Sequence, residues 1–238
     1  MPSLYPAEKP TTLLDPLPKT DLSWTAEIVA DLHSDQGEFE EARSLLSEAE
    51  AFRRAEGWEE FIRPQILMAR ACLGLGEYEA AQAYLNLSLG MAVWDEENHL
   101  VGWLQQYQGD VALGCQDQGK ARLFYRNSLR LFWGQQDMAG VFLALSGLSA
   151  TEEAERSERL QGATQALSQT DERVSRILKP HERQRQMYES AVAASRVALG
   201  EASFTAAWDA GRAMTLEQAG EYTLSADDAC PPLLGKQN

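Results

Sequence analysis

Apolar residues recur along most of the chain at the three- and four-residue spacing that places them on one side of an α-helix. This pattern predicts an all-α fold in which successive helices pair as antiparallel hairpins. The expected helix pairs are 23–36 with 39–56, 61–75 with 78–93, 97–115 with 118–133, and 137–151 with 154–168.

The chain also contains an internal repeat. The segment GEFEEARSLL begins at Gly37, and GEYEAAQAYL begins 39 residues later at Gly76. A weaker copy, QDQGKARLFY, begins at Gln116 after 40 more residues, and EEAERSERLQ begins at Glu152 after another 36. Repeats of this length are typical of stacked helical hairpins. The short last interval predicts that about three residues are missing from the fourth turn.

Small residues recur at fixed distances from each turn position. They predict where helices cross closely, and larger residues such as Leu46, Leu85 and Tyr125 fill the space between the crossings. Five residues after the turn lie Ala42, Ala81, Ala121 and Ser157; seven before it lie Ala30, Ala69 and Gly109; twelve after it lie Ala49, Ser88, Ser128 and Thr164.

The turns Gly37-Glu38-Phe39 and Gly76-Glu77-Tyr78 resemble those of the tetratricopeptide repeat. This resemblance implies antiparallel helical hairpins stacked as a right-handed superhelix, with a C-terminal helical cap. We expect a Pro-rich tail over 1–20, four tetratricopeptide-like helix pairs over 21–168, capping helices over 169–225 and a second tail over 226–238. The first tail holds five of the nine prolines.

The expected cap has its own start and stop signals. Pro180 is suited to a helix start, and Gly200 to a helix end. A short helix is expected over 203–212. Thr215 then begins another, with Gln218 three residues later completing a capping box.

The C-terminal region resembles a more specific family. Arg159-Leu160 and Gly162-Ala163, followed later by Ala206-Ala207-Trp208 and Gly211-Arg212-Ala213, are similar to the ends of bacterial LuxR/AfsR/MalT-like regulators. In these signal-transduction ATPases an NTPase core precedes tetratricopeptide-like repeats. The resemblance covers about residues 22–225 and implies a repeat arm that senses an inducer or a partner.

The chain departs from those regulators in several respects. Ser195 stands where the family more often has alanine, and Asp171 to Ile177 replace its usual Gly-x-Pro-Leu. The sequence contains neither the P-loop motif of the NTPase domain nor the family's helix-turn-helix. Because the chain begins with Met1, we expect a stand-alone relative or a shortened form of such a regulator.

The charge argues against nucleic-acid and membrane partners. The net charge is −15, and the best basic row, Arg122-Arg126-Arg130, is short. We find no signal peptide and no run of 18 apolar residues, so a cytoplasmic location is expected. Of the three cysteines, Cys72 and Cys115 lie in apolar helical context and are predicted to be buried.

No known catalytic or cofactor motif emerges. The histidines His33, His99 and His181 form no metal-binding spacing, and acidic pairs such as Glu40-Glu41 are typical of solvated helix faces. We therefore expect no enzyme activity, no cofactor and no metal site.

The candidate binding residues come from repeat positions that face the concave side in tetratricopeptide folds. Trp24 and Trp103 lie thirteen residues before their turns, and each is interpreted either as a binding contact or as packing for a neighbouring segment such as the Pro-rich tail. A helix-lined groove of this kind holds peptides. The predicted groove residues are Trp24, Glu27, Asp31, Arg63, Arg70, Trp103, Gln106 and Asp110.

The leading functional prediction is a protein-interaction or sensor module of a bacterial transcriptional regulatory system. It would bind a protein or peptide partner in the groove, and self-association is a further expectation. The alternatives are small-ligand (inducer) sensing within the superhelix and, with least support, an enzyme of unrecognised type. These functions rest on resemblance, since a fold does not by itself fix a function.

Overall fold

A computed structural model describes residues 19–57, 62–94, 98–170 and 192–224. Across these residues the regular structure is α-helical, which confirms the predicted all-α fold. Most predicted ends agree within two residues, although α1 begins at Lys19, inside the expected tail. The helix bounds are α1 Lys19–Gln36, α2 Phe39–Ala55, α3 Ile62–Leu75, α4 Tyr78–Trp94, α5 Asn98–Gly114, α6 Gln118–Gln135, α7 Met138–Ser149, α8 Ala154–Thr170, α11 Glu201–Arg212 and α12 Leu216–Leu224.

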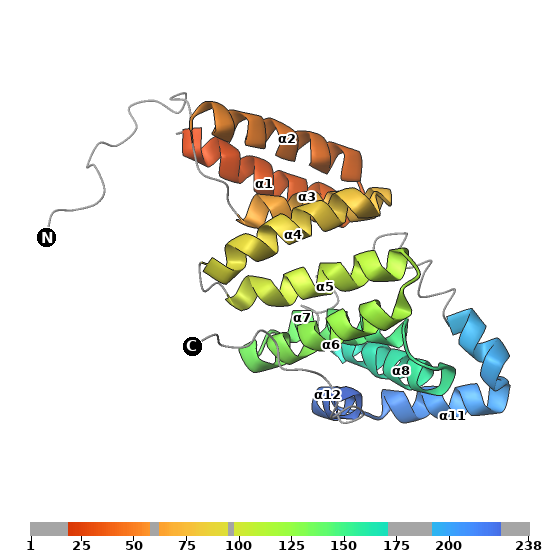
Figure 1. Cartoon of the computed structure of the whole chain (residues 1–238). Coiled ribbons are helices and arrows are strands. Elements are labelled where there is room, and N and C mark those ends of the chain that lie inside the picture. Colours follow the sequence, from red (N-terminus) through yellow and green to blue (C-terminus); the bar gives the residue numbers. More distant parts are fainter. Residues whose placement is uncertain (1–18, 58–61, 95–97, 171–191, 225–238) are drawn as a thin grey trace, which may run out of the picture.

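Consecutive helices pack as hairpins, α1 with α2, α3 with α4, α5 with α6 and α7 with α8. The hairpins are stacked in chain order, and α11 and α12 lie at the opposite end of the molecule from α1 and α2 (Figure 1). The first helices of the hairpins, α1, α3, α5 and α7, also contact one another in that order. A right-handed tetratricopeptide-like superhelix goes beyond these contacts and stays a prediction.

The first three hairpin turns share one geometry. Gly37, Gly76 and Gln116 have φ values of 81°, 79° and 63°, and the amide after each donates to a carbonyl five residues back. Glycine adopts this left-handed conformation without strain, whereas Gln116 adopts it despite its side chain. The degraded third copy therefore keeps the turn. The fourth differs, since Ala150, the residue that follows α7, has a right-handed conformation with a φ of −74°.

The predicted small residues lie at the helix crossings. Ala30, Ala42, Ala69, Ala81 and Ala121 are completely buried. Gly109 lies against the ring of Tyr125, where an added Cβ would meet that ring at 2.5 Å. The structure thus confirms that small residues are buried at these repeat positions.

The cap follows the predicted signals where it is described. Residues 192–199 are helical, Gly200 has a φ of 74°, and the Thr215 and Gln218 side chains each accept a hydrogen bond from the other's backbone amide. The expected helix start at Pro180, most of the 169–178 connection and the second tail lie outside the described residues. So do positions 1–18 of the Pro-rich tail.

Two sequence predictions bear on location and chemistry. None of the described helices is long and apolar enough to cross a membrane. Cys72 is buried as predicted, and burial raises the pKa of its thiol. The prediction for Cys115 is wrong: this residue is exposed, because it lies past the end of α5 in the turn before Gln116.

Candidate functional site: the first-helix face

The predicted binding residues lie on α1, α3 and α5, which contact one another along one side of the stack. We call this surface the first-helix face. The residues fall at three repeat positions, and these positions differ in their burial and in their contacts. Six residues before the turn lie Asp31, Arg70 and Asp110; ten before it lie Glu27, Ile66 and Gln106; thirteen before it lie Trp24, Arg63 and Trp103.

The position ten residues before the turn is interior. Glu27 is only 7% exposed and Gln106 only 4%. Glu27 accepts a hydrogen bond from Arg53 of α2, which also donates to Ser23 at 2.9 Å. Gln106 accepts one from the Ser128 hydroxyl of α6 at 3.3 Å. Both residues were predicted to face a partner, and that assignment is wrong because they join the two helices of their own hairpins.

Ile66 of α3 occupies the equivalent position in the second hairpin and is 7% exposed. An apolar residue at this position was the sequence signal that it points inward. The charged Glu27 and the amide Gln106 masked that signal, since such residues are mostly exposed in folded proteins.

The position six residues before the turn carries contacts between hairpins. Arg70 of α3 donates to Asp31 of α1 at 2.6 Å and also to Asp35. The Arg70 side chain is 22% exposed, whereas that of Asp31 is 36% exposed and that of Asp35 58%. These ion pairs tie the first hairpin to the second along the first-helix face. A partner binding here would meet acidic groups already paired with arginine.

The third residue at this position, Asp110, lies within its own hairpin. Its side chain is partly buried and accepts a hydrogen bond from the Tyr125 hydroxyl at 2.8 Å. Burial raises the pKa of Asp110 to about 7, since a carboxylate loses hydration there, while the Tyr125 hydrogen bond acts in the opposite direction.

We predict a pH-dependent stability from Asp110. Its pKa in the unfolded chain is about 3.9, so between about pH 4 and 7 the folded state holds the proton more tightly. The unfolding free energy of the wild type should therefore fall relative to that of Asp110→Asn as the pH rises through this interval. A free-energy change of ~1.4 kcal/mol for each unit of the pKa shift sets the upper limit of the fall. We expect a total fall of about 2 kcal/mol, below that limit, because the side chain is only partly buried. Urea denaturation at each pH measures it, and a constant difference between the two proteins would contradict the prediction.

At the position thirteen residues before the turn, the two tryptophans lie in different environments. Trp103 packs edge-on against Phe132 of α6, with ring centroids 5.1 Å apart, and lies 6.2 Å from the Tyr107 ring. Of the two readings for Trp103, its environment favours packing. Trp24 is 68% exposed, and the Arg63 side chain is 57% exposed, with its nearest carboxylate oxygens, on Asp31 and Glu27, 3.8 and 3.9 Å away. Trp24 and Arg63 are therefore the two predicted residues most accessible to a partner.

The sequence reasoning missed two further exposed residues beside Trp24. Ile28 and Leu32 are each 53% exposed and follow Trp24 at four-residue spacing, so the three share one side of α1. We call Trp24, Ile28 and Leu32 the α1 stripe. An apolar row of this kind is normally taken as a helix face turned toward the core, which is why the sequence alone did not distinguish it.

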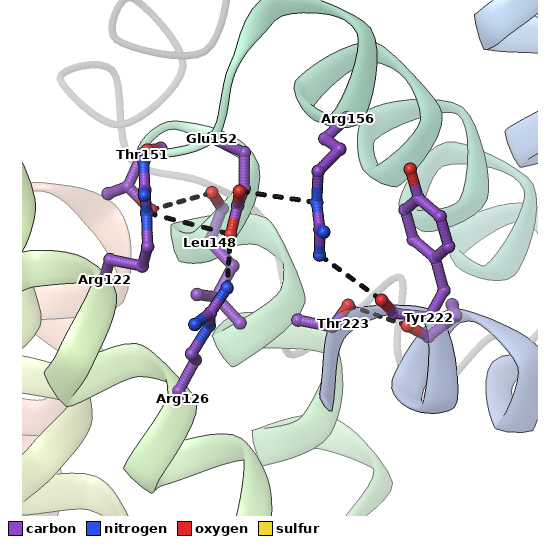
Figure 2. A network of polar contacts seen from close by, with 9 residues as sticks. Arg122, Arg126, Leu148, Thr151, Glu152, Arg156, Tyr222 and Thr223 are labelled. Carbon is purple, nitrogen blue, oxygen red and sulfur yellow. Dashed lines mark hydrogen bonds and ion pairs between the residues drawn. The ribbon is translucent and has the colours of Figure 1, made fainter. Parts of the chain in front are cut away.

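A second polar cluster, distant in sequence from these residues, lies at the α7–α8 turn (Figure 2). The Glu152 carboxylate is 3.1 Å from Arg126, 3.4 Å from Arg156 and 3.8 Å from Arg122. Arg122 also donates to the Thr151 carbonyl, and Arg156 donates to the Tyr222 carbonyl of α12 at 3.3 Å. Arg122 and Arg126 of the best basic row are thus engaged with this turn, and Arg156 links the turn to the cap, which makes this cluster a structural junction.

Within the described part of the chain, no group of three or more His, Cys, Asp or Glu side chains is placed to hold a metal ion. The comparisons with known proteins add no assignment: no family model, curated protein or solved structure matches the chain.

Proposed function

We propose that the chain is a protein-interaction or sensor module of a bacterial regulatory system, holding a protein or peptide segment along the first-helix face. The observation that carries this proposal is the exposure of Trp24 and Arg63 at the same repeat position on neighbouring helices. Tryptophan and arginine are the side chains most enriched among residues that dominate binding energy at protein interfaces. Covering them with a partner would bury apolar surface without disturbing the core.

The charges around these two residues favour a partner segment of mixed charge. Arg63 offers donors to an acidic group, whereas Asp31 and Asp35 beside Arg70 offer acceptors to a basic one. The resemblance of the C-terminal motif to LuxR/AfsR/MalT-like regulators supports the regulatory setting. An NTPase or a helix-turn-helix regulator encoded by a neighbouring gene is therefore the first partner to examine.

Site-specific photo-crosslinking in the native bacterium tests the proposal. A benzoylphenylalanine at position 63 should capture a discrete partner, and the same group at Ala83, an exposed position on α4, should not. Adding Trp24→Ser should reduce the capture at position 63 several-fold. Equal capture from both positions, or none at position 63, would argue against binding at the first-helix face.

A further inference from the structure

Ile28 and Leu32 of the α1 stripe lie at the repeat positions by which the second and third hairpins pack on the hairpin before them, whereas Trp24 corresponds to the exposed Arg63. Counting 39 residues forward, Ile28 corresponds to Leu67 and Leu32 to Ala71 of α3. Leu67 and Ala71 are 6% and 0% exposed, and they pack in one apolar cluster with Ala30, Ala42 and Leu46 of the preceding hairpin.

The same relation holds one hairpin further along. Counting 40 residues from α3, Tyr107 and Val111 of α5 are the equivalent residues. Val111 is 5% exposed and belongs to an apolar cluster built mainly by α3 and α4, against which Tyr107 packs. Two successive hairpins thus use these positions to receive a preceding pair of helices. In the first hairpin the same positions are exposed.

We propose that the α1 stripe docks an amphipathic helix of a partner protein, one that carries basic residues beside its apolar face and adds to the stack ahead of α1. The site borders the first-helix face, with which it shares Trp24, but it is argued from Ile28 and Leu32 and does not rest on the function proposed above. The chemistry of the partner follows from the contact that the second hairpin already makes.

At that contact Arg43 of α2 donates to both carboxylate oxygens of Glu77, at 2.8 and 2.9 Å, beside the apolar cluster. Glu38 is the equivalent of Glu77 in the first hairpin, and its side chain is 47% exposed next to His33. An incoming helix with arginine or lysine one residue after a small residue, as in Ala42-Arg43, would reach Glu38 in the same way. The net charge of −15 also favours a basic partner.

A second copy of this chain fits the stripe less well than a basic partner does. At the other end of the stack α11 packs on α8, and α12 contacts α6, α7 and α8, so among the described residues the cap covers part of the last hairpin, where a head-to-tail copy would stack (Figure 1). Two copies, each with a net charge of −15, would also repel one another on association.

Peptide binding to the full chain tests this proposal. The probe is a fluorescent peptide with the sequence of residues 37–57, in which the exposed Glu41 and Glu48 are replaced by lysine. It is stapled on its exposed face, and circular dichroism confirms that it is helical before use. We expect saturable binding by fluorescence anisotropy, weakened at least tenfold by Ile28→Ser with Leu32→Ser in the protein. A peptide carrying Arg43→Glu should also bind at least tenfold more weakly.

The matched control is Val197→Ser, which removes an apolar side chain that is 87% exposed elsewhere on the surface and should leave binding unchanged. Absence of binding, or binding that the double variant leaves intact, overturns the proposal. Sedimentation supplies a further test: a wild-type dimer that the double variant converts to monomer would show that a second copy occupies the stripe, and would overturn it as well. Crosslinking at position 63 reports on binding at the first-helix face, whereas the peptide reports on the α1 stripe. The proposed function and this inference can therefore fail separately.

Discussion

Replacing Gly211 with alanine should destabilise the C-terminal cap by up to about 2 kcal/mol. In α11 a Cβ on Gly211 would lie 1.9 Å from the Arg159 carbonyl oxygen of α8, and a Cβ on Gly162 of α8 would lie 2.3 Å from the Trp208 carbonyl oxygen. Backbone cannot move aside as a flexible side chain does, so the helices must separate. Overpacking of this kind typically costs about 1–3 kcal/mol, which outweighs the ~1 kcal/mol that alanine gains over glycine in helix propensity.

Urea denaturation followed by circular dichroism measures the loss, and hydrogen exchange of the α11 amides tests whether it is localised to the cap. Gly90→Ala in α4 is the matched control, because no atom lies within 4 Å of the added Cβ. This control should gain up to ~1 kcal/mol from helix propensity alone. If the two variants have the same stability, the close α8–α11 crossing is not a constraint on the fold.

Replacing Glu152 with alanine should cost about 2–4 kcal/mol of unfolding free energy. The Glu152 side chain is 5% exposed and is the shared carboxylate of Arg122, Arg126 and Arg156, whose side chains are 36%, 10% and 26% exposed (Figure 2). Removing one partner of a buried ion pair typically costs about 3–5 kcal/mol, because the remaining charge stays desolvated. The partial exposure of Arg122 and Arg156 lowers our expectation, since water can hydrate them.

Chemical denaturation again gives the free energy, and two further variants identify its origin. Glu155→Ala removes a carboxylate that is 67% exposed and paired with Arg159, so it should change stability by less than about 0.5 kcal/mol. Adding Arg126→Met to Glu152→Ala should recover part of the loss, because Arg126 is the most buried of the three arginines that lose the Glu152 carboxylate. A double variant no more stable than Glu152→Ala would show that charge burial is not the cause.

The cap and the α7–α8 turn show why such contacts escape sequence reasoning. Gly162 and Gly211 belong to the two segments that resemble the regulator family, and the structure brings them to a single helix crossing. Because 49 residues separate the two glycines, the sequence does not predict that they meet. Glu152 was recognised only as the start of the fourth repeat. Two of its three arginine partners, Arg122 and Arg126, come from α6 and could not be paired with it by spacing alone.

The sequence determined the hairpins, their turns and the small residues at their crossings, because these features depend on short-range periodicity and on residue size. Ala42, Ala81 and Ala121 are buried for the same local reason in every copy. Gln116 keeps the turn because the hydrogen bonds around it require the same left-handed backbone as Gly37.

Which polar and aromatic residues of the first helices remain accessible depends on the contacts between helices. Trp103 is packed because α6 places Phe132 beside it, whereas the equivalent residue in α2 is Arg53, which turns inward to Glu27 and leaves Trp24 exposed. Likewise, Ile28 and Leu32 are exposed although Leu67 and Ala71 at the same repeat positions are buried. The repeat fixes where a side chain points, but its neighbours across the helix crossing fix whether anything covers it.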